Sequence, residues 1–530
     1  MARQAAPVVF IGLDACDPAL AQQFAAAGEM PTLARMLAGG TRAPVRNPFG
    51  LFVGSVWPTL ATGLRADRHE FHCWDEIDIA TYERRLTQPP RIRPFWKSVS
   101  DAGRKIAVLD VPHVRADQPI DGLHVAEWGN HDRHFGFHTW PPAAAAEIES
   151  TYGLHPILGI RAREVGQFAA DDYVHRAALY RTADEDDVFL KGLLRGLDAK
   201  RALVSDQLAR GGWDLFFTVF GESHAIGHQQ WHLHDPTHPR FEAARAAALG
   251  GDPVRQVYRA LDGALADALA KVPKDATTLV LLSHGMAAHY DGTHLLDAVL
   301  TRLDGFDRAP PPMNNAVALG KRALAKLPAA VQRRLVAVAA PWLRARVAAH
   351  PPVPCNEYAT AAQRARQDFF LAPNNYSCGG VRLNVVGREP HGCVEPRDVD
   401  AVCRRLEKEL LALVNVTTGG RVVRRVSRSD RLYRRSPRDT LPDLFVEWEN
   451  TALIETVWSA KSGTVYGPYA HWRTGDHRPD GLLIALGPGM PRGVAQAALE
   501  AEDLAPSIAA RLGVALDDID GKVAPWLGGR

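Results

Sequence analysis

Five residues of types that bind metal ions stand beside short apolar runs of this sequence. They are Asp14, His224, His228, His284 and His477. In α/β folds, functional groups collect at the carboxyl ends of the strands. Neutral imidazoles and a carboxylate that converge there would form a site suited to zinc, manganese or iron. The pattern therefore predicts a metal site at one edge of a sheet.

Each residue also has a plainer interpretation. An isolated histidine at a strand end is usually a hydrogen-bonded structural residue, and Asp14 could cap the helix that follows it. The joint pattern favours the metal site, because independent structural histidines have no reason to recur beside apolar runs. His224 and His228 are four residues apart, so one helical turn places them on the same face. For the neighbouring histidines we expect a supporting role around the metal or in a substrate-facing loop: His232, His234 and His238.

Short β-rich apolar runs predict the elements that position these residues. Most runs are continuous rather than alternating, which is typical of strands covered on both faces. Helix-prone segments separate them, among them 253–270 with Asp252 as a candidate N-cap, and 400–413. The alternation predicts an α/β three-layer sandwich with a mostly parallel central sheet. The predicted strands are 8–14, 106–111, 215–221, 278–283, 381–386, 443–447 and 482–487.

Two stretches interrupt this alternation and predict helical cap insertions in one hydrolase domain that spans residues 1–530. The first, near 140–210, is mainly helical in pattern. The second, near 309–367, opens with prolines and continues as a basic amphipathic segment. Such a segment could lie on a membrane or on a partner. We expect instead that it packs its apolar face on its own domain.

Composition excludes some partners. The chain has 62 Lys and Arg against 60 Asp and Glu, a net charge of +2, so no nucleic-acid-binding signature is present. No run approaches the length that spans a bilayer, and the N-terminal apolar run is short for a signal peptide. The 6 cysteines are scattered without a CxxC pair. We therefore expect a cytoplasmic protein with reduced thiols and no membrane association.

Several motifs resemble one family. "VVFIGLDACDP", "MPTLARMLAGGTRAPV", "VWPTLATGLRADRHEFH", "LLSHGM", "VRLNVVGREPHG" and "GDHRPDGLLIALGPG" are similar, in order, to motifs of the type I phosphodiesterase/nucleotide pyrophosphatase branch of the alkaline-phosphatase superfamily. The matches span nearly the whole chain. The resemblance implies an alkaline-phosphatase-like fold and a phosphate ester as substrate.

The resemblance also implies a catalytic centre. Family members use two metal ions around a Thr or Ser nucleophile, which forms a covalent intermediate. Carried over by motif, Asp14 and His284 would hold the metal beside the nucleophile. His224, His228 and His477 would hold the other metal. We expect one or two divalent ions per chain, zinc ahead of manganese or iron.

Three positions depart from the family pattern. His224 and Ser283 each replace an Asp ligand, which makes the site about two charges less negative and should weaken binding of the second cation. Asp291, in a nearby ligand-rich loop, is a possible substitute carboxylate. Val53 occupies the nucleophile position, and the nearest hydroxyl belongs to Ser55, whose plainer role would be a helix N-cap. Ser55 is thus the candidate catalytic residue.

The sequence predicts a metal-dependent hydrolase of phosphate esters, acting on small-molecule, glycan or lipid phosphates. A sulfate-ester hydrolase is an alternative, although the C-x-P-S-R pattern of sulfatases is absent. Another alternative is a catalytically degenerate member that binds metal without turnover. The sequence leaves open the physiological substrate, the number of metals and the oligomeric state.

Overall fold

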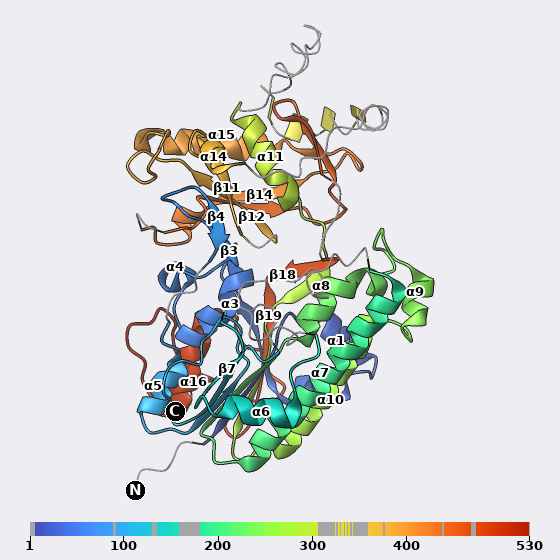
Figure 1. Cartoon of the computed structure of the whole chain (residues 1–530), viewed down its shortest axis with the longest axis vertical. Coiled ribbons are helices and arrows are strands. Elements are labelled where there is room, and N and C mark those ends of the chain that lie inside the picture. Colours follow the sequence, from blue (N-terminus) through green and yellow to red (C-terminus); the bar gives the residue numbers. More distant parts are fainter. Residues whose placement is uncertain are drawn as a thin grey trace. The chain divides into compact units, whose positions relative to one another are not determined.

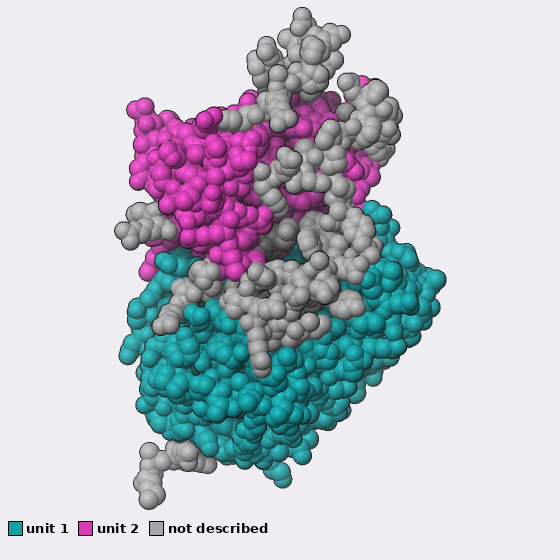
Figure 2. Space-filling view, viewed as in Figure 1, with its two compact units in different colours: residues 1–71, 88–288, 471–530 teal, residues 72–87, 289–470 magenta. Residues whose placement is uncertain are grey.

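The chain divides into two compact units (Figure 2). Unit 1 comprises residues 1–71, 88–288 and 471–530, and unit 2 comprises residues 72–87 and 289–470. The single hydrolase domain expected over 1–530 stays a prediction. The computed structural model describes residues 6–87, 92–129, 135–157, 181–305, 324, 327–328, 330–332, 334–335, 338–339, 342, 359–374, 377–436, 439–467 and 473–528.

Unit 1 is built on a mostly parallel sheet of nine strands, counted over the described residues. In order across the sheet they are β20 (Leu499–Glu500), β2 (Thr41–Arg46), β19 (Asp480–Leu486), β9 (Thr277–Leu282), β1 (Val8–Leu13), β8 (Leu215–Phe220), β5 (Ile106–Leu109), β6 (Gly122–Ala126) and β7 (His138–Trp140). From β9 to β6 all neighbours are parallel. Strands β19 and β7 run antiparallel to their neighbours.

Helices cover both faces of this sheet, as the continuous apolar runs require. All six residues of β1 are buried. Val8 and Phe10 share a core with α3 (Phe52–Thr62), α5 (Phe95–Asp101) and α16 (Leu504–Arg511). The opposite face carries α1 (Pro18–Ala26), α2 (Pro31–Gly39), α7 (Ala183–Arg210), α8 (Glu222–His234) and α10 (Pro253–Lys271) (Figure 1). The predicted three-layer α/β sandwich is confirmed.

Smaller elements complete unit 1. Strands β10 (Gly285–Ala288) and β18 (Gly475–Arg478) form an antiparallel pair beside the central sheet. The short helices are α4 (Ala66–His69), α6 (Ala144–Tyr152), α9 (Ala243–Ala248) and the 3₁₀ turn η4 (Ala501–Asp503).

Unit 2 is an antiparallel sheet with its own apolar core. The four strands, in order, are β11 (Phe369–Ala372), β12 (Cys378–Leu383), β15 (Leu444–Trp448) and β14 (Val423–Arg428). Smaller sheets pair β13 (Val414–Asn415) with β16 (Thr456–Ser459) and β17 (Gly463–Tyr466), and β3 (Asp75–Ile77) with β4 (Arg84–Leu86). Its helices are α11 (Thr293–Leu303), α14 (Ala361–Arg364), α15 (Val399–Leu411) and the turns η2 (Pro396–Asp398) and η3 (Ser429–Arg431).

All seven predicted strands are strands, but two of them lie outside the parallel sheet. The runs 381–386 and 443–447 correspond to β12 and β15, which pair antiparallel in unit 2. A continuous apolar run reports burial on both faces and carries no information about strand direction. The two predicted helices correspond to α10 and α15, and the Asp252 side chain does cap α10 by accepting from the Arg255 amide at 3.1 Å.

The first predicted insertion contains α6 and α7, while residues 158–180 lie outside the described part of the chain. Most of the second insertion also lies outside it. None of the helices described is both long enough and apolar enough to cross a membrane. The described cysteines are free thiols: Cys16, Cys73, Cys378, Cys393 and Cys403.

Substitution of Gly12 in β1 tests how closely α3 packs on the sheet. A Cβ built at Gly12 would lie 2.5 Å from Cη2 of Trp57 on α3. We expect Gly12→Ala to lower the free energy of unfolding by about 1–3 kcal/mol, because this core has no room for the methyl group. Denaturant unfolding measures the change. Gly39→Ala is the control, since no atom lies within 4 Å of its added Cβ; equal stability of the two variants would contradict the prediction.

Candidate metal centre

Five side chains from four segments of the chain meet at the carboxyl edge of the sheet in unit 1. Asp14 follows β1, His284 follows β9, and His224 and His228 lie on α8, which begins two residues after β8. Because β9, β1 and β8 are adjacent and parallel, their carboxyl ends meet. His477 arrives on β18, which pairs with β10 directly after His284. All five are buried, so the structure brings together the whole predicted set of metal ligands.

Three of the histidines point their Nε2 atoms at one another. The Nε2 atoms of His224 and His228 are 2.9 Å apart, and those of His228 and His477 are 3.1 Å apart. The three ligand atoms all lie within 4.8 Å of one another. Imidazole nitrogens about 2.0–2.1 Å from a tetrahedral zinc lie about 3.3 Å from each other. The spacing therefore matches three corners of a metal site.

The hydrogen bonds on the outer side of two rings fix which nitrogen carries the proton. His228 Nδ1 lies 2.8 Å from the Gly475 carbonyl oxygen, which only accepts, so Nδ1 is the protonated nitrogen. His224 Nδ1 lies 2.7 Å from Asp14 Oδ2 and donates to it in the same way. Both Nε2 atoms then lie on the inner side of the cluster, 2.9 Å apart. Metal-bound histidines usually have this arrangement, in which the outer nitrogen is hydrogen-bonded and the inner nitrogen faces the ion.

Asp14 is surrounded by donors. Oδ1 accepts from Trp57 Nε1 at 2.8 Å and from the Ser283 hydroxyl at 3.1 Å. His224 donates to Oδ2. Burial raises the pKa of the Asp14 carboxyl, but His224 and His284 lower it more strongly, and the net pKa lies well below its usual value. Asp14 is thus an ionised acceptor that holds His224 in place.

His284 lies beside the three-histidine cluster. Its Nε2 is 3.5 Å from Asp14 Oδ1, and its ring centroid lies 4.5 Å from that of His477. Burial, followed by the charges of His284 and His224, lowers the pKa of His477 well below its usual value. His477 is therefore a neutral imidazole, the form that binds metal.

Helix α3 carries the candidate nucleophile. The Ser55 hydroxyl is buried and donates to the Leu51 carbonyl oxygen at 2.8 Å. The N-cap of α3 is Leu51, so the alternative role of Ser55 as an N-cap is wrong. Asp14 is not a cap either, because Asp17 caps α1. The Phe52 ring of α3 lies beside the histidines, with its centroid 5.8 Å from that of His284.

The remaining motif residues shape the end of α3. Gly63 has φ +69° and ends the helix in the left-handed conformation, which favours glycine. His69 Nε2 lies 2.9 Å from the Thr59 hydroxyl. These residues support the helix rather than touch the histidine cluster.

Other histidines near the cluster are bonded within the protein. His232 Nδ1 lies 3.1 Å from the Thr474 hydroxyl, and burial lowers the pKa of His232 to about 3. His234 Nδ1 lies 2.7 Å from Asp252 Oδ2. In unit 2, Asp291 pairs with His289 and accepts from the Thr293 amide. Its role as a substitute carboxylate stays a prediction.

Sequence reasoning missed three supporting groups: the Trp57 indole, the Ser283 hydroxyl as a donor to Asp14, and the Gly475 carbonyl. Trp57 and Ser283 belong to motifs that the sequence shows. Their roles could not be predicted, because these depend on the direction in which each side chain points. The Gly475 carbonyl left no sequence signal, because any residue supplies a backbone oxygen.

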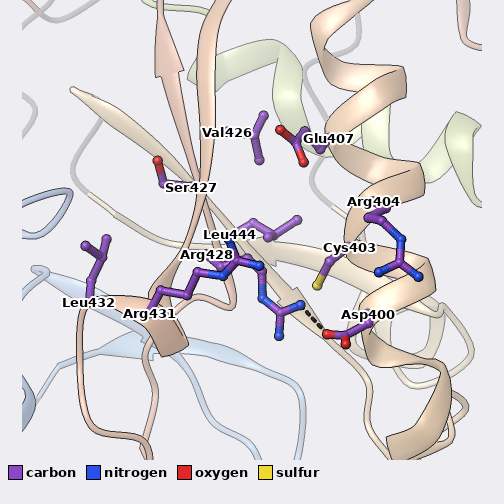
Figure 3. A pocket seen from close by; sticks show the side chains of 10 residues that line it. All are labelled: Asp400, Cys403, Arg404, Glu407, Val426, Ser427, Arg428, Arg431, Leu432 and Leu444. Carbon is purple, nitrogen blue, oxygen red and sulfur yellow. Dashed lines mark hydrogen bonds and ion pairs between the residues drawn. The ribbon is translucent and has the colours of Figure 1, made fainter.

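Unit 2 contains a separate cavity of about 330 Å³ between α15 and β14. Figure 3 shows Arg428 reaching across it to Asp400, with which it forms an ion pair. No histidine lines this cavity, and it is distinct from the metal centre. Its lining residues are Asp400, Cys403, Arg404, Glu407, Val426, Ser427, Arg428, Arg431, Leu432 and Leu444.

Removal of one imidazole tests the three-histidine cluster. We expect His477→Ala to lose tightly bound metal, because two imidazoles remain where three converged. Metal content after gel filtration, measured by mass spectrometry, gives the stoichiometry. His234→Ala is the matched control, since this histidine of α8 bonds Asp252 instead. Equal metal content in both variants would refute the assignment.

Among the solved structures similar to this chain are three of ectonucleotide pyrophosphatase/phosphodiesterase 5. Murine ectonucleotide pyrophosphatase/phosphodiesterase 5 is similar in structure, with a TM-score of 0.50, 11% identity and 97% coverage of each chain. Its inactive variant in complex with AMP gives a TM-score of 0.49, 10% identity and 98% coverage of each chain, and the human counterpart gives 0.47, 10% and 97%. A search of curated protein sequences finds no match. The profile of the type I phosphodiesterase/nucleotide pyrophosphatase family matches residues 8–480, so the chain belongs to this family.

Proposed function

We propose that the chain is a metal-dependent hydrolase of phosphate esters, with a divalent metal ion held by His224, His228 and His477. The observation that carries the proposal is the convergence of their three Nε2 atoms within 4.8 Å in a buried site. Family membership supports the substrate class, since the family comprises phosphodiesterases and nucleotide pyrophosphatases. Zinc is the ion we propose, with manganese or iron as alternatives.

The donor set fits such an ion. Three imidazoles are a typical ligand set of a catalytic zinc, which keeps a fourth position open. Two of the three rings here, those of His224 and His228, have outer hydrogen bonds. A divalent ion there would supply positive charge beside the phosphoryl group and lower the pKa of a water molecule. His224 and His228 are oriented for this by Asp14 and the Gly475 carbonyl. Asp14 acts through His224, so we assign it a positioning role.

We further propose that water, rather than a side-chain hydroxyl, attacks phosphorus. The Ser55 hydroxyl is directed at the Leu51 carbonyl. The first residues of α3 are Phe52 and Val53, which have no nucleophilic atom. The Phe52 ring, beside His284 and His477, would exclude bulk water from one side of the site.

A catalytically degenerate, metal-binding protein is the second candidate. The observation that favours it is that Asp14 accepts hydrogen bonds from Trp57, Ser283 and His224. Three of the roughly four lone-pair sites of the Asp14 carboxylate thus accept hydrogen bonds instead of binding a second ion. If turnover in this scaffold requires two ions, a single three-histidine site would bind metal without turnover.

Chelation and reloading separate the two candidates. We expect the purified protein to carry about one equivalent of metal. When the metal is removed, the protein should no longer hydrolyse bis-p-nitrophenyl phosphate or p-nitrophenyl phosphate. Addition of zinc or manganese should restore the activity. Metal binding without hydrolysis of either ester would instead support the degenerate member. Turnover confined to p-nitrophenyl sulfate would support the sulfate-ester alternative. Full activity after complete chelation would exclude the metal-dependent mechanism.

Replacement of Ser55 tests the attacking group. We expect Ser55→Ala to keep its kcat within about threefold of the parent, because only a helix hydrogen bond, worth about 1 kcal/mol of stability, is lost. Thr62→Ala is the control. The Thr62 hydroxyl, at the C-terminal end of α3, makes the same kind of bond, to the Pro58 carbonyl oxygen at 2.7 Å. A loss of kcat by about a hundredfold or more in Ser55→Ala alone would identify Ser55 as the nucleophile.

A further inference from the structure

Helix α8 is kinked two residues after the candidate metal ligand His228. Gln230 has φ −133° and ψ 21°, which lies outside the helical range, so α8 consists of two helical pieces. The residues at the kink are Gln229, Gln230 and Trp231, and none of them is a proline or a glycine. A side chain that enters the ladder of helical hydrogen bonds is another known cause of a kink.

Thr474 supplies such a side chain. It lies directly before β18, which packs beside α8 (Figure 1). The Thr474 hydroxyl donates to the His228 carbonyl oxygen at 3.3 Å and accepts from the His232 amide at 3.3 Å. In a regular helix this carbonyl and this amide, four residues apart, bond to each other. One residue from outside the helix thus contacts both groups that flank the kink.

Buried side chains of unit 1 also hold the kink. The Gln230 side-chain amide donates to the carboxylate and to the carbonyl oxygen of Asp186, both at 3.1 Å. The Arg181 guanidinium donates to the Gln229 carbonyl oxygen at 3.1 Å. All four side chains are buried. Specific contacts therefore fix the kink, and it is a built part of the structure.

Thr474 connects the two segments that carry His228 and His477. Its amide donates to the His228 carbonyl oxygen at 2.6 Å. The next residue, Gly475, accepts from His228 Nδ1 at 2.8 Å through its carbonyl oxygen. A Cβ built at Gly475 would lie 2.3 Å from the Gly227 carbonyl oxygen, so strand and helix touch along their backbones. The position of β18 against α8 therefore sets the 3.1 Å between Nε2 of His228 and Nε2 of His477.

We propose that Thr474 is a positioning residue of the metal centre, whose hydroxyl holds β18 against the kink of α8 and so sets the spacing of His228 and His477. This inference rests on the proposed three-histidine metal site. The hydroxyl is the specific part of Thr474, because any residue supplies the amide. Without it, the buried His232 amide and His232 Nδ1, 3.1 Å from the hydroxyl, would each lose a partner. The two segments would then shift to satisfy these groups, and the ligands would move with them.

Zinc affinity of the full chain, measured by competition with a chromophoric chelator, tests the proposal. Thr474→Val keeps the size of the side chain and removes the hydroxyl, whereas Thr474→Ser keeps the hydroxyl. We expect Thr474→Val to bind zinc about 10- to 100-fold more weakly than the parent, the loss typical of groups that orient metal ligands. We expect Thr474→Ser to stay within about threefold of the parent, because its hydroxyl can make the same bonds.

The matched control is Thr218→Val. Thr218 is also buried, on β8 of unit 1, and its hydroxyl makes no hydrogen bond among the described residues. We expect this variant to bind zinc as the parent does. Circular dichroism of the metal-free proteins shows whether each variant folds, and we expect all of them to fold.

The outcomes separate this inference from the proposed function. Parent-like zinc affinity of Thr474→Val, or an equal loss in Thr474→Ser, would overturn the role of the hydroxyl and leave the metal centre in place. An unfolded metal-free Thr474→Val would also overturn it, since Thr474 would then serve the fold rather than the ligand spacing. A parent that binds no zinc would remove the metal centre itself, and this inference with it.

Discussion

The hydrogen bond between Asp14 Oδ2 and His224 Nδ1, 2.7 Å long, determines what the centre can bind. It places a proton on the outer nitrogen of His224 and turns Nε2 toward His228 and His477. The three Nε2 atoms meet in a buried site, where a cation between them would be bound by all three. The fold maintains this arrangement through adjacent parallel strands, which deliver Asp14 and α8 to the same edge of the sheet.

The same hydrogen bond explains how the departures from the family pattern fit together. With His224 in place of a carboxylate, the site needs an acceptor for the second ring nitrogen, and Asp14 supplies it. With Ser283 in place of a second carboxylate, a hydroxyl donates to Asp14 instead of repelling it. The result is a group of three imidazoles with one ionised carboxylate beside them.

The sequence predicted the strands beside the candidate ligands well, because β1, β8 and β9 are continuous apolar runs that end in polar residues. It also predicted α10 with its Asp252 cap. It could not separate the antiparallel strands β12 and β15 from the parallel sheet, since burial leaves the same pattern in both. The sequence also could not predict the directions in which side chains point. Ser55 and Trp57 lie two residues apart on α3. The Ser55 hydroxyl nevertheless donates to the backbone of its own helix, whereas the Trp57 indole donates to Asp14.

Anomalous diffraction from crystals of the metal-loaded protein, collected on both sides of the zinc absorption edge, tests the account most directly. The account predicts one ion, about 2.0–2.1 Å from Nε2 of His224, His228 and His477, with Asp14 still bonded to His224 Nδ1. An ion coordinated by the Asp14 carboxylate, or no ion among the three imidazoles, would contradict it.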